Sequence, residues 1–144
     1  MEDVKIVRPD DVEPTLLPAT RGKEAGWLKR IVFPPNVDTK GAFFGVAEVN
    51  PTYSVHRWHS HVRDKAEGYE VVYPENFEEV YYIISGTGVV QWKTEDGKIK
   101  EENVSAGDTM FFPIGVAEHQ VVNTSDEKMF VAFFGTPLHK VTLT

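Results

Sequence analysis

Two closely spaced histidines and a pair of glutamates are the residues of this chain best suited to hold a metal ion. His59 and His61 are separated by one residue, and Glu78 and Glu79 lead into the apolar run 80–84. Alternate side chains of a β-strand point to the same face, so His59 and His61 can bind one ion if this segment is extended. The surrounding valine, tyrosine and isoleucine residues favour strands.

A third imidazole lies far along the chain. His119 follows a turn at Pro113-Ile-Gly115 and begins another expected strand. Three histidines and one carboxylate make a mixed nitrogen and oxygen site if a barrel brings these strands together. Such a ligand set suits Fe(II), Mn(II), Ni(II) or Zn(II) better than copper(I), because a chain without cysteine supplies no thiolate.

The order and spacing of these residues resemble the two motifs of the cupin superfamily. The first motif joins His-x-His to a glutamate that stands six intervening residues before a glycine, as His59, His61, Glu79 and Gly86 do. The second motif joins glycine, Pro-x-Gly, histidine and asparagine, and it matches Gly107, Pro113, Gly115, His119 and Asn123. The two motifs occur in the family's order, which is specific for the fold.

The resemblance implies an all-β fold, a jelly-roll (cupin) β-barrel. It implies that His59, His61, Glu79 and His119 bind a divalent metal ion, namely Fe, Mn, Zn or Ni. We expect a metal-dependent enzyme whose small oxygen-rich substrate, a carboxylate, carbonyl or enediol, is chelated to the metal. Dioxygenase chemistry and lyase or isomerase chemistry are both open. The alternative is a non-catalytic cupin that binds a small molecule or a sugar, because one fold hosts many functions.

The chain departs from the family pattern in three places. Tyr53 replaces the leading glycine of the first motif, and the loop before His119 is one residue longer than usual. The gap between His61 and Glu79 is much longer than in the family and contains the insertion 62–77. We expect this insertion to form a loop at the barrel mouth that acts as a lid or touches the substrate, and a solvated surface loop is the alternative.

Strand alternation nominates two residues for catalytic roles. Arg57 would share the face of His59, where its planar guanidinium could bind an anionic group of the substrate, unless a bulge turns it outward. Tyr81 would share the face of Glu79 and serve as a phenolic proton donor, and a packed strand aromatic is the alternative. By the same alternation His56 would face outward, as a surface residue or as a neighbour that supports the ligands.

Short strands separated by turn-forming residues recur along the chain and predict a sandwich or barrel. They are expected at residues 26–33, 42–49, 53–61, 79–85, 88–93, 98–104, 109–112, 119–122 and 129–134. Met110 and Phe112 would line the interior. The first twenty residues, 1–20, contain three prolines, at positions 9, 14 and 18, and are expected to form an extended arm.

Length and composition set the wider frame. With 144 residues and 41% hydrophobic content, residues 1–144 are expected to form a single domain. A net charge of −7 disfavours nucleic acid as a partner, and no apolar run approaches the roughly 20 residues of a membrane helix. We expect a small-molecule substrate. Basic residues near the histidines could attract an anionic one. The remaining expectations are a homodimer, formed by the arm pairing with a partner's sheet edge, and a cytoplasmic location.

Overall fold

The computed structural model describes residues 3–17, 25–56, 58–60, 71–72, 76–137 and 142–143. Eleven strands and one three-residue 3-10 helix, η1 (Pro9–Asp11), make up the regular structure of these residues. Every pair of neighbouring strands is antiparallel. The prediction of an all-β fold is confirmed. Within the described residues no helix has the length and hydropathy needed to span a membrane.

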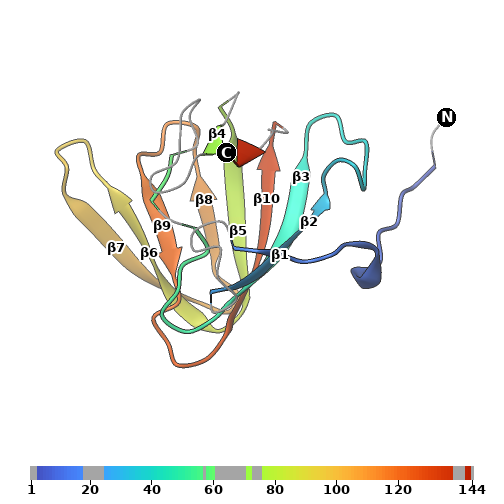
Figure 1. Cartoon of the computed structure of the whole chain (residues 1–144). Helices are drawn as coiled ribbons and strands as arrows, with labels where there is room; N and C mark the ends of the chain where they lie inside the picture. Colours follow the sequence, from blue (N-terminus) through green and yellow to red (C-terminus); the bar gives the residue numbers. More distant parts are fainter. Residues whose placement is uncertain are drawn as a thin grey trace.

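Two sheets form the body of the protein (Figure 1). The larger has six strands in the order β1-β2-β3-β10-β5-β8, and the smaller has three in the order β7-β6-β9. The bounds in the larger sheet are β1 (Thr15–Leu16), β2 (Gly26–Val32), β3 (Phe43–Val49), β10 (Met129–Thr136), β5 (Glu78–Ser85) and β8 (Thr109–Phe112). Those in the smaller sheet are β7 (Ile99–Ser105), β6 (Thr87–Lys93) and β9 (His119–Val122). A separate two-stranded pair joins β4 (Val71–Val72) to β11 (Thr142–Leu143).

The hydrophobic core lies between the two sheets. Strand β3 shows why: its residues alternate between fully buried and half-buried positions along its whole length. Ile83 of β5 and Val131 of β10, in the larger sheet, are completely buried. Val121 of β9, in the smaller sheet, is completely buried as well. Two antiparallel sheets packed face to face over an apolar interior are the arrangement of a jelly-roll, so this prediction is also confirmed.

Eight of the nine expected strands are present, within two residues of their expected ends. The exception is the segment 53–61. Its described residues make only two isolated bridges to the smaller sheet, from Ser54 to Val122 and from His59 to His119. The prediction of a continuous strand here is wrong, because the chain touches β9 at two separate points and does not run in register with it.

The N-terminal segment is partly attached to its own sheet. Residues Thr15 and Leu16 pair with Leu28 and Trp27 of β2, so β1 covers the edge that β2 would otherwise leave open. Lys29 Nζ also donates a hydrogen bond to the carbonyl oxygen of Pro9, at 2.8 Å. Val7 and Arg8, just before η1, line a surface pocket with side chains of the larger sheet, and the chain before them extends away from the sheets (Figure 1). The pairing of this arm with a second copy stays a prediction.

Candidate metal centre

His59 and His119 are held side by side by their own backbones. The amide of His59 donates to the carbonyl oxygen of His119 at 3.2 Å, and the amide of His119 donates to the carbonyl oxygen of His59 at 2.9 Å. Directly opposed residues of an antiparallel pair place their side chains on the same face. The two imidazole rings accordingly lie with their centroids 4.6 Å apart. Both side chains are buried.

His56 is the third member of this group, contrary to the sequence prediction. Its ring centroid lies 3.7 Å from that of His59 and 5.5 Å from that of His119. Only 6% of the residue is exposed. The outward position expected from strand alternation is therefore wrong. The reason is that the described residues between the bridges at Ser54 and His59 do not form a regular strand, so strict alternation does not apply to them.

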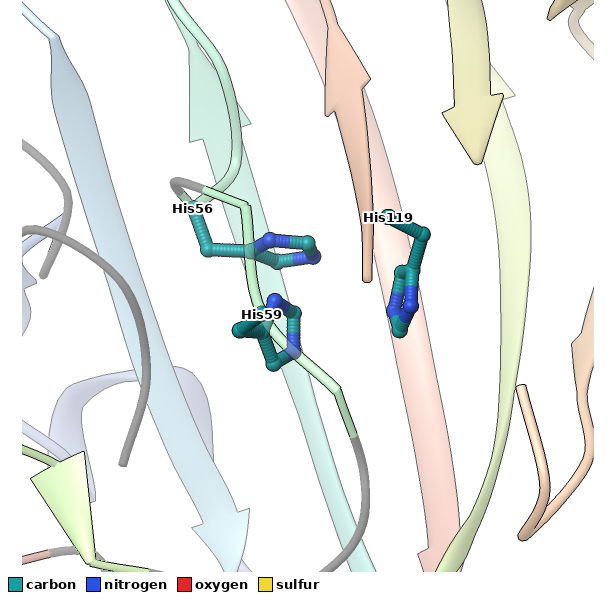
Figure 2. A group of neighbouring side chains, drawn as sticks. All are labelled: His56, His59 and His119. Carbon is teal, nitrogen blue, oxygen red and sulfur yellow. The ribbon is translucent and has the colours of Figure 1, made fainter. Parts of the chain in front are cut away.

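Figure 2 shows His56 and His59 on one segment, facing His119 on β9. One possible ligand atom from each of the three residues lies within 4.8 Å of the others. Three nitrogen donors so close together fit a first-row divalent ion, for which imidazole is a suitable ligand. The Nε2 atoms of His56 and His119 are buried and make no hydrogen bond to any residue that the structure describes. Burial of a polar atom costs free energy that a metal bond would offset.

The tautomer of His119 suits a ligand. Its Nδ1 atom lies 3.1 Å from the carbonyl oxygen of Ala117. A carbonyl can only accept a hydrogen bond, so Nδ1 carries the proton and the neutral ring keeps its lone pair on Nε2. A backbone partner of this kind orients metal-binding histidines in many proteins. The chain thereby prepares Nε2 of His119 to donate to an ion.

Glu79 of β5 is buried near the histidines. Burial raises the pKa of this carboxyl from its ordinary value of 4.5 to about 8, while His119, a hydrogen bond from the Tyr81 hydroxyl and Arg30 act in the opposite direction. Glu79 is not one of the three residues whose ligand atoms are mutually close. Tyr81 and Glu79 share the inner face of β5, as strand alternation predicts, and both are buried.

Aromatic side chains surround the histidines. The ring of Phe112 stacks on His119 with a centroid distance of 4.4 Å and an angle of 20° between the ring planes. Tyr81 meets Phe112 edge to face at 5.2 Å. Met110 and Phe112 are buried, as the sequence predicts for residues that line the interior. These rings exclude water from one side of the group, which strengthens electrostatic interactions there.

Asn123, the last residue of the second motif, has a structural role. Its Nδ2 atom donates to the carbonyl oxygens of Val49 at 2.9 Å and Glu127 at 2.7 Å. Its Oδ1 atom accepts from the amide and the hydroxyl of Ser125, at 3.0 and 2.8 Å. Three of these hydrogen bonds fix the turn between β9 and β10 and the fourth ties it to β3, which places β9 and therefore His119.

Two site residues proposed from the sequence lie outside the described residues, namely Arg57 and His61. Most of the insertion 62–77 does as well, although residues 71–72 form β4 and Phe77 is buried against Phe43, with ring centroids 5.7 Å apart. The sequence analysis overlooked Arg30, whose charge acts on Glu79. Alternation along 26–33 places Arg30 on the face of Leu28 and could have nominated it.

Comparison with known proteins agrees with this architecture. No curated protein matches the sequence. The polyketide cyclase RemF of Streptomyces resistomycificus is similar in structure, with a TM-score of 0.67 and 17% identity over 99% of this chain and 86% of that one. A protein of Thermotoga maritima described as a predicted oxalate decarboxylase has a TM-score of 0.65 and 22% identity over 93% of this chain and 100% of its own.

A putative sugar phosphate isomerase of Acidithiobacillus ferrooxidans is also similar, with a TM-score of 0.63 and 16% identity over 92% of this chain and 75% of that one. At these identities the likeness concerns the fold. The family model described as cupin domain matches residues 45–134, more than half of the sequence. The match includes the three clustered histidines and the whole of the smaller sheet. The chain therefore belongs to the cupin family.

Proposed function

We propose that this protein is a metal-dependent enzyme that acts on a small oxygen-rich substrate. The observation that carries the proposal is the buried group of His56, His59 and His119, whose ligand atoms lie within 4.8 Å of one another. His59 and His119 are also among the histidines that the family motifs nominate. His56 joins them in the proposed ligand set because its ring lies against that of His59.

Glu79 and His61 complete the proposed ligand set. The carboxyl of Glu79 is buried beside His119, which influences its pKa. A bound cation would favour the ionised form of this carboxyl, so metal binding would release its proton. His61 enters the proposal on the His-x-His motif alone. Arg57 stays a candidate for binding an anionic group of the substrate, on the sequence argument.

The proposed chemistry combines Lewis acidity with proton donation. A divalent ion at this site would polarise a bound carbonyl or carboxylate. The Tyr81 hydroxyl donates a hydrogen bond to the carboxylate of Glu79, so Tyr81 is the proposed phenolic proton donor. The ring of Phe112 shields the imidazole of His119 from bulk water.

The substrate class rests on the names of similar structures. A polyketide cyclase, a predicted oxalate decarboxylase and a putative sugar phosphate isomerase each act, by their names, on oxygen-rich small molecules. This range supports the class of substrate and leaves dioxygenase, lyase and isomerase chemistry as candidates. The identity of the metal decides among them, because iron(II) supports oxygen chemistry whereas zinc, manganese and nickel suit eliminations and isomerisations.

Metal content of protein purified without an affinity tag tests the proposal. We expect about one equivalent of Fe, Mn, Ni or Zn by inductively coupled plasma mass spectrometry. The variants His56→Ala, His59→Ala and His119→Ala should lose it. Gln120→Ala is the matched control, because Gln120 lies on the opposite face of β9 and pairs through its amide with Gln91.

Full metal retention in the His59→Ala and His119→Ala proteins would contradict the metal site. Failure of the wild-type protein to take up any of the four ions on reconstitution would instead favour a non-catalytic binding protein. If only the His56→Ala protein kept its metal, His56 would not be a ligand, and the ligands nominated by the family motifs would remain.

We further propose that the protein forms a homodimer. The outer face of the larger sheet carries exposed apolar side chains on three neighbouring strands: Tyr82 and Ile84 of β5, Phe111 of β8 and Phe134 of β10. An apolar surface of this kind favours association. Light scattering coupled to size-exclusion chromatography should give twice the 16.3 kDa mass of the chain. The double variant Phe111→Lys/Phe134→Lys should give the mass of one chain. The cytoplasmic location stays a prediction.

A further inference from the structure

The open side of the sandwich contains a cavity that the metal centre does not use. Strands β7 and β8 are edge strands of different sheets, and they do not pair with each other. A cavity of about 420 Å³ lies where they face, lined by β6, β7, β8 and the first residues after β8. We call it the seam cavity and define it by Val90, Trp92, Glu102, Met110, Phe112 and Val116. Its volume falls within the range of about 300–1,000 Å³ typical of small-molecule sites.

The lining of the seam cavity is apolar and aromatic, with one charge. Trp92 and Phe112 supply aromatic surface, and Met110 supplies a polarisable thioether that adapts to different shapes. Glu102 is the only charged residue of the lining. It is exposed, its backbone pairs with Val90 of β6, and its carboxylate makes no hydrogen bond or ion pair with any residue that the structure describes. An apolar pocket with one convergent polar group is the usual form of a site that orients a small ligand.

We propose that the seam cavity binds a flat apolar molecule that carries a cationic amine. The aromatic walls match the ring system, and the carboxylate of Glu102 matches the ammonium group. The indole of Trp92 adds a second attraction, because cations are drawn to the face of a tryptophan ring. An anionic ligand would meet Glu102 without any cation of the lining to compensate. Charge therefore selects the amine over the acid.

The seam cavity is separated from the histidines by a single layer of side chains. Phe112 forms part of its wall, and the same ring stacks on His119. Trp92, another wall residue, is the direct cross-strand partner of His119 in the pairing of β6 with β9. The seam cavity is nevertheless a distinct site, because none of the three clustered histidines lines it. Its ligand is bound without the metal.

Calorimetric titration with protonated 1-naphthylmethylamine tests the proposal on the metal-free chain of 144 residues. We expect saturable binding of one molecule per chain, and binding at least about tenfold weaker for 1-naphthylacetate, which has the same rings and the opposite charge. Val116→Trp places a ring in the cavity and should weaken binding of the amine by at least about tenfold. Ile99→Trp, on an exposed position of β7 outside the lining, should leave it unchanged.

Two further variants separate charge from shape. Glu102→Gln should remove most of the preference for the amine over the acid. Glu101→Gln should preserve it, because the Glu101 carboxylate accepts a hydrogen bond from Gln91 and is not part of the cavity lining. The His59→Ala protein should bind the amine with the affinity of the wild type, because the seam cavity does not include the metal site. Amine binding can therefore be found even if the metal proposal fails. The absence of saturable binding, or an affinity for the amine in the Val116→Trp protein equal to that of the wild type, would overturn the proposal.

Discussion

Phe112 of β8 and His119 of β9 stack nearly parallel, with their ring centroids 4.4 Å apart, although they belong to different sheets. The same imidazole is held by its Nδ1 contact with Ala117 and by the backbone bridge to His59. Its Nε2 atom is therefore fixed before any ion arrives. Preorganisation of this kind strengthens metal binding because the ligand loses little freedom.

Replacement of the stacked ring should weaken metal binding. Phe112→Leu keeps an apolar side chain but removes the flat surface, and we expect metal affinity to fall by about tenfold, the lower range for residues that orient metal ligands. Phe111→Leu is the matched control, because Phe111 is 59% exposed on the other face of the same strand. Competition with a chromophoric chelator measures both affinities. Equal affinities would show that the stack does not orient His119.

Metal binding should stabilise the folded protein. An ion that binds only the native state adds about 2.7 kcal/mol at a concentration 100 times its dissociation constant. We expect thermal unfolding of the metal-free protein to shift upward on addition of the ion found in the native preparation. The shift should disappear in His119→Ala and persist in Gln120→Ala. A shift that survives in His119→Ala would place the ion elsewhere.

The stability of the metal-free protein should depend on the ionisation of Glu79. Burial holds its folded pKa at about 8, above the ordinary 4.5, so the native state binds a proton that the unfolded state releases. Stability contributed by this group is full below pH 4.5 and falls as the pH rises to about 8. The loss is on the order of a few kcal/mol, since a tenfold change in proton affinity corresponds to about 1.4 kcal/mol.

Urea unfolding of the metal-free protein at several pH values between 4.5 and 9 measures this loss. Glu79→Gln should flatten the dependence in that window, because the amide does not titrate. Glu78→Gln, on the outer face of the same strand, should leave the slope unchanged. A slope that is the same in wild type and Glu79→Gln would contradict the assignment.

Gly45 is needed because the ring of Phe133 lies across it. A Cβ atom at this position would meet the Phe133 ring and the backbone oxygen of Lys29 too closely for both to stay in place. Gly45→Ala should therefore destabilise the fold by about 1–3 kcal/mol, as overpacked cores do. Gly115→Ala should cost much less, because nothing lies within 4 Å of its added Cβ. Chemical denaturation distinguishes the two, and equal costs would refute the argument from the Phe133 ring.

Asn123 should matter for stability and not for the chemistry of the ion. Asn123→Ala breaks four hydrogen bonds and leaves the Val49 and Glu127 carbonyl oxygens without this donor, so we expect a loss of about 2–3 kcal/mol. Asn103→Ala, at an exposed position of β7, should change stability by less than about 0.5 kcal/mol. The folded Asn123→Ala protein should still bind one ion. Loss of the ion from the folded Asn123→Ala protein would show that Asn123 contributes to the metal site.

Strand positions were predictable from the sequence because their signal is local. The alternation of apolar and polar residues in 42–49 or 129–134 reports which face of a strand is buried, and turn residues mark the ends. The two-residue strands β1, β4 and β11 were not predicted, because two residues carry no periodicity. The motif spacing also nominated His59 and His119, which the fold brings together.

The role of His56 was decided only by the tertiary structure. The described residues around it meet β9 at two isolated bridges and form no regular strand, and no local pattern of residue types encodes such an arrangement. The raised pKa of Glu79 likewise arises from burial between two sheets that are distant in sequence. The sequence by itself determined the strands, the family and two of the clustered histidines. The tertiary structure brought His56 to them, because proximity across a sandwich is a property of the whole fold.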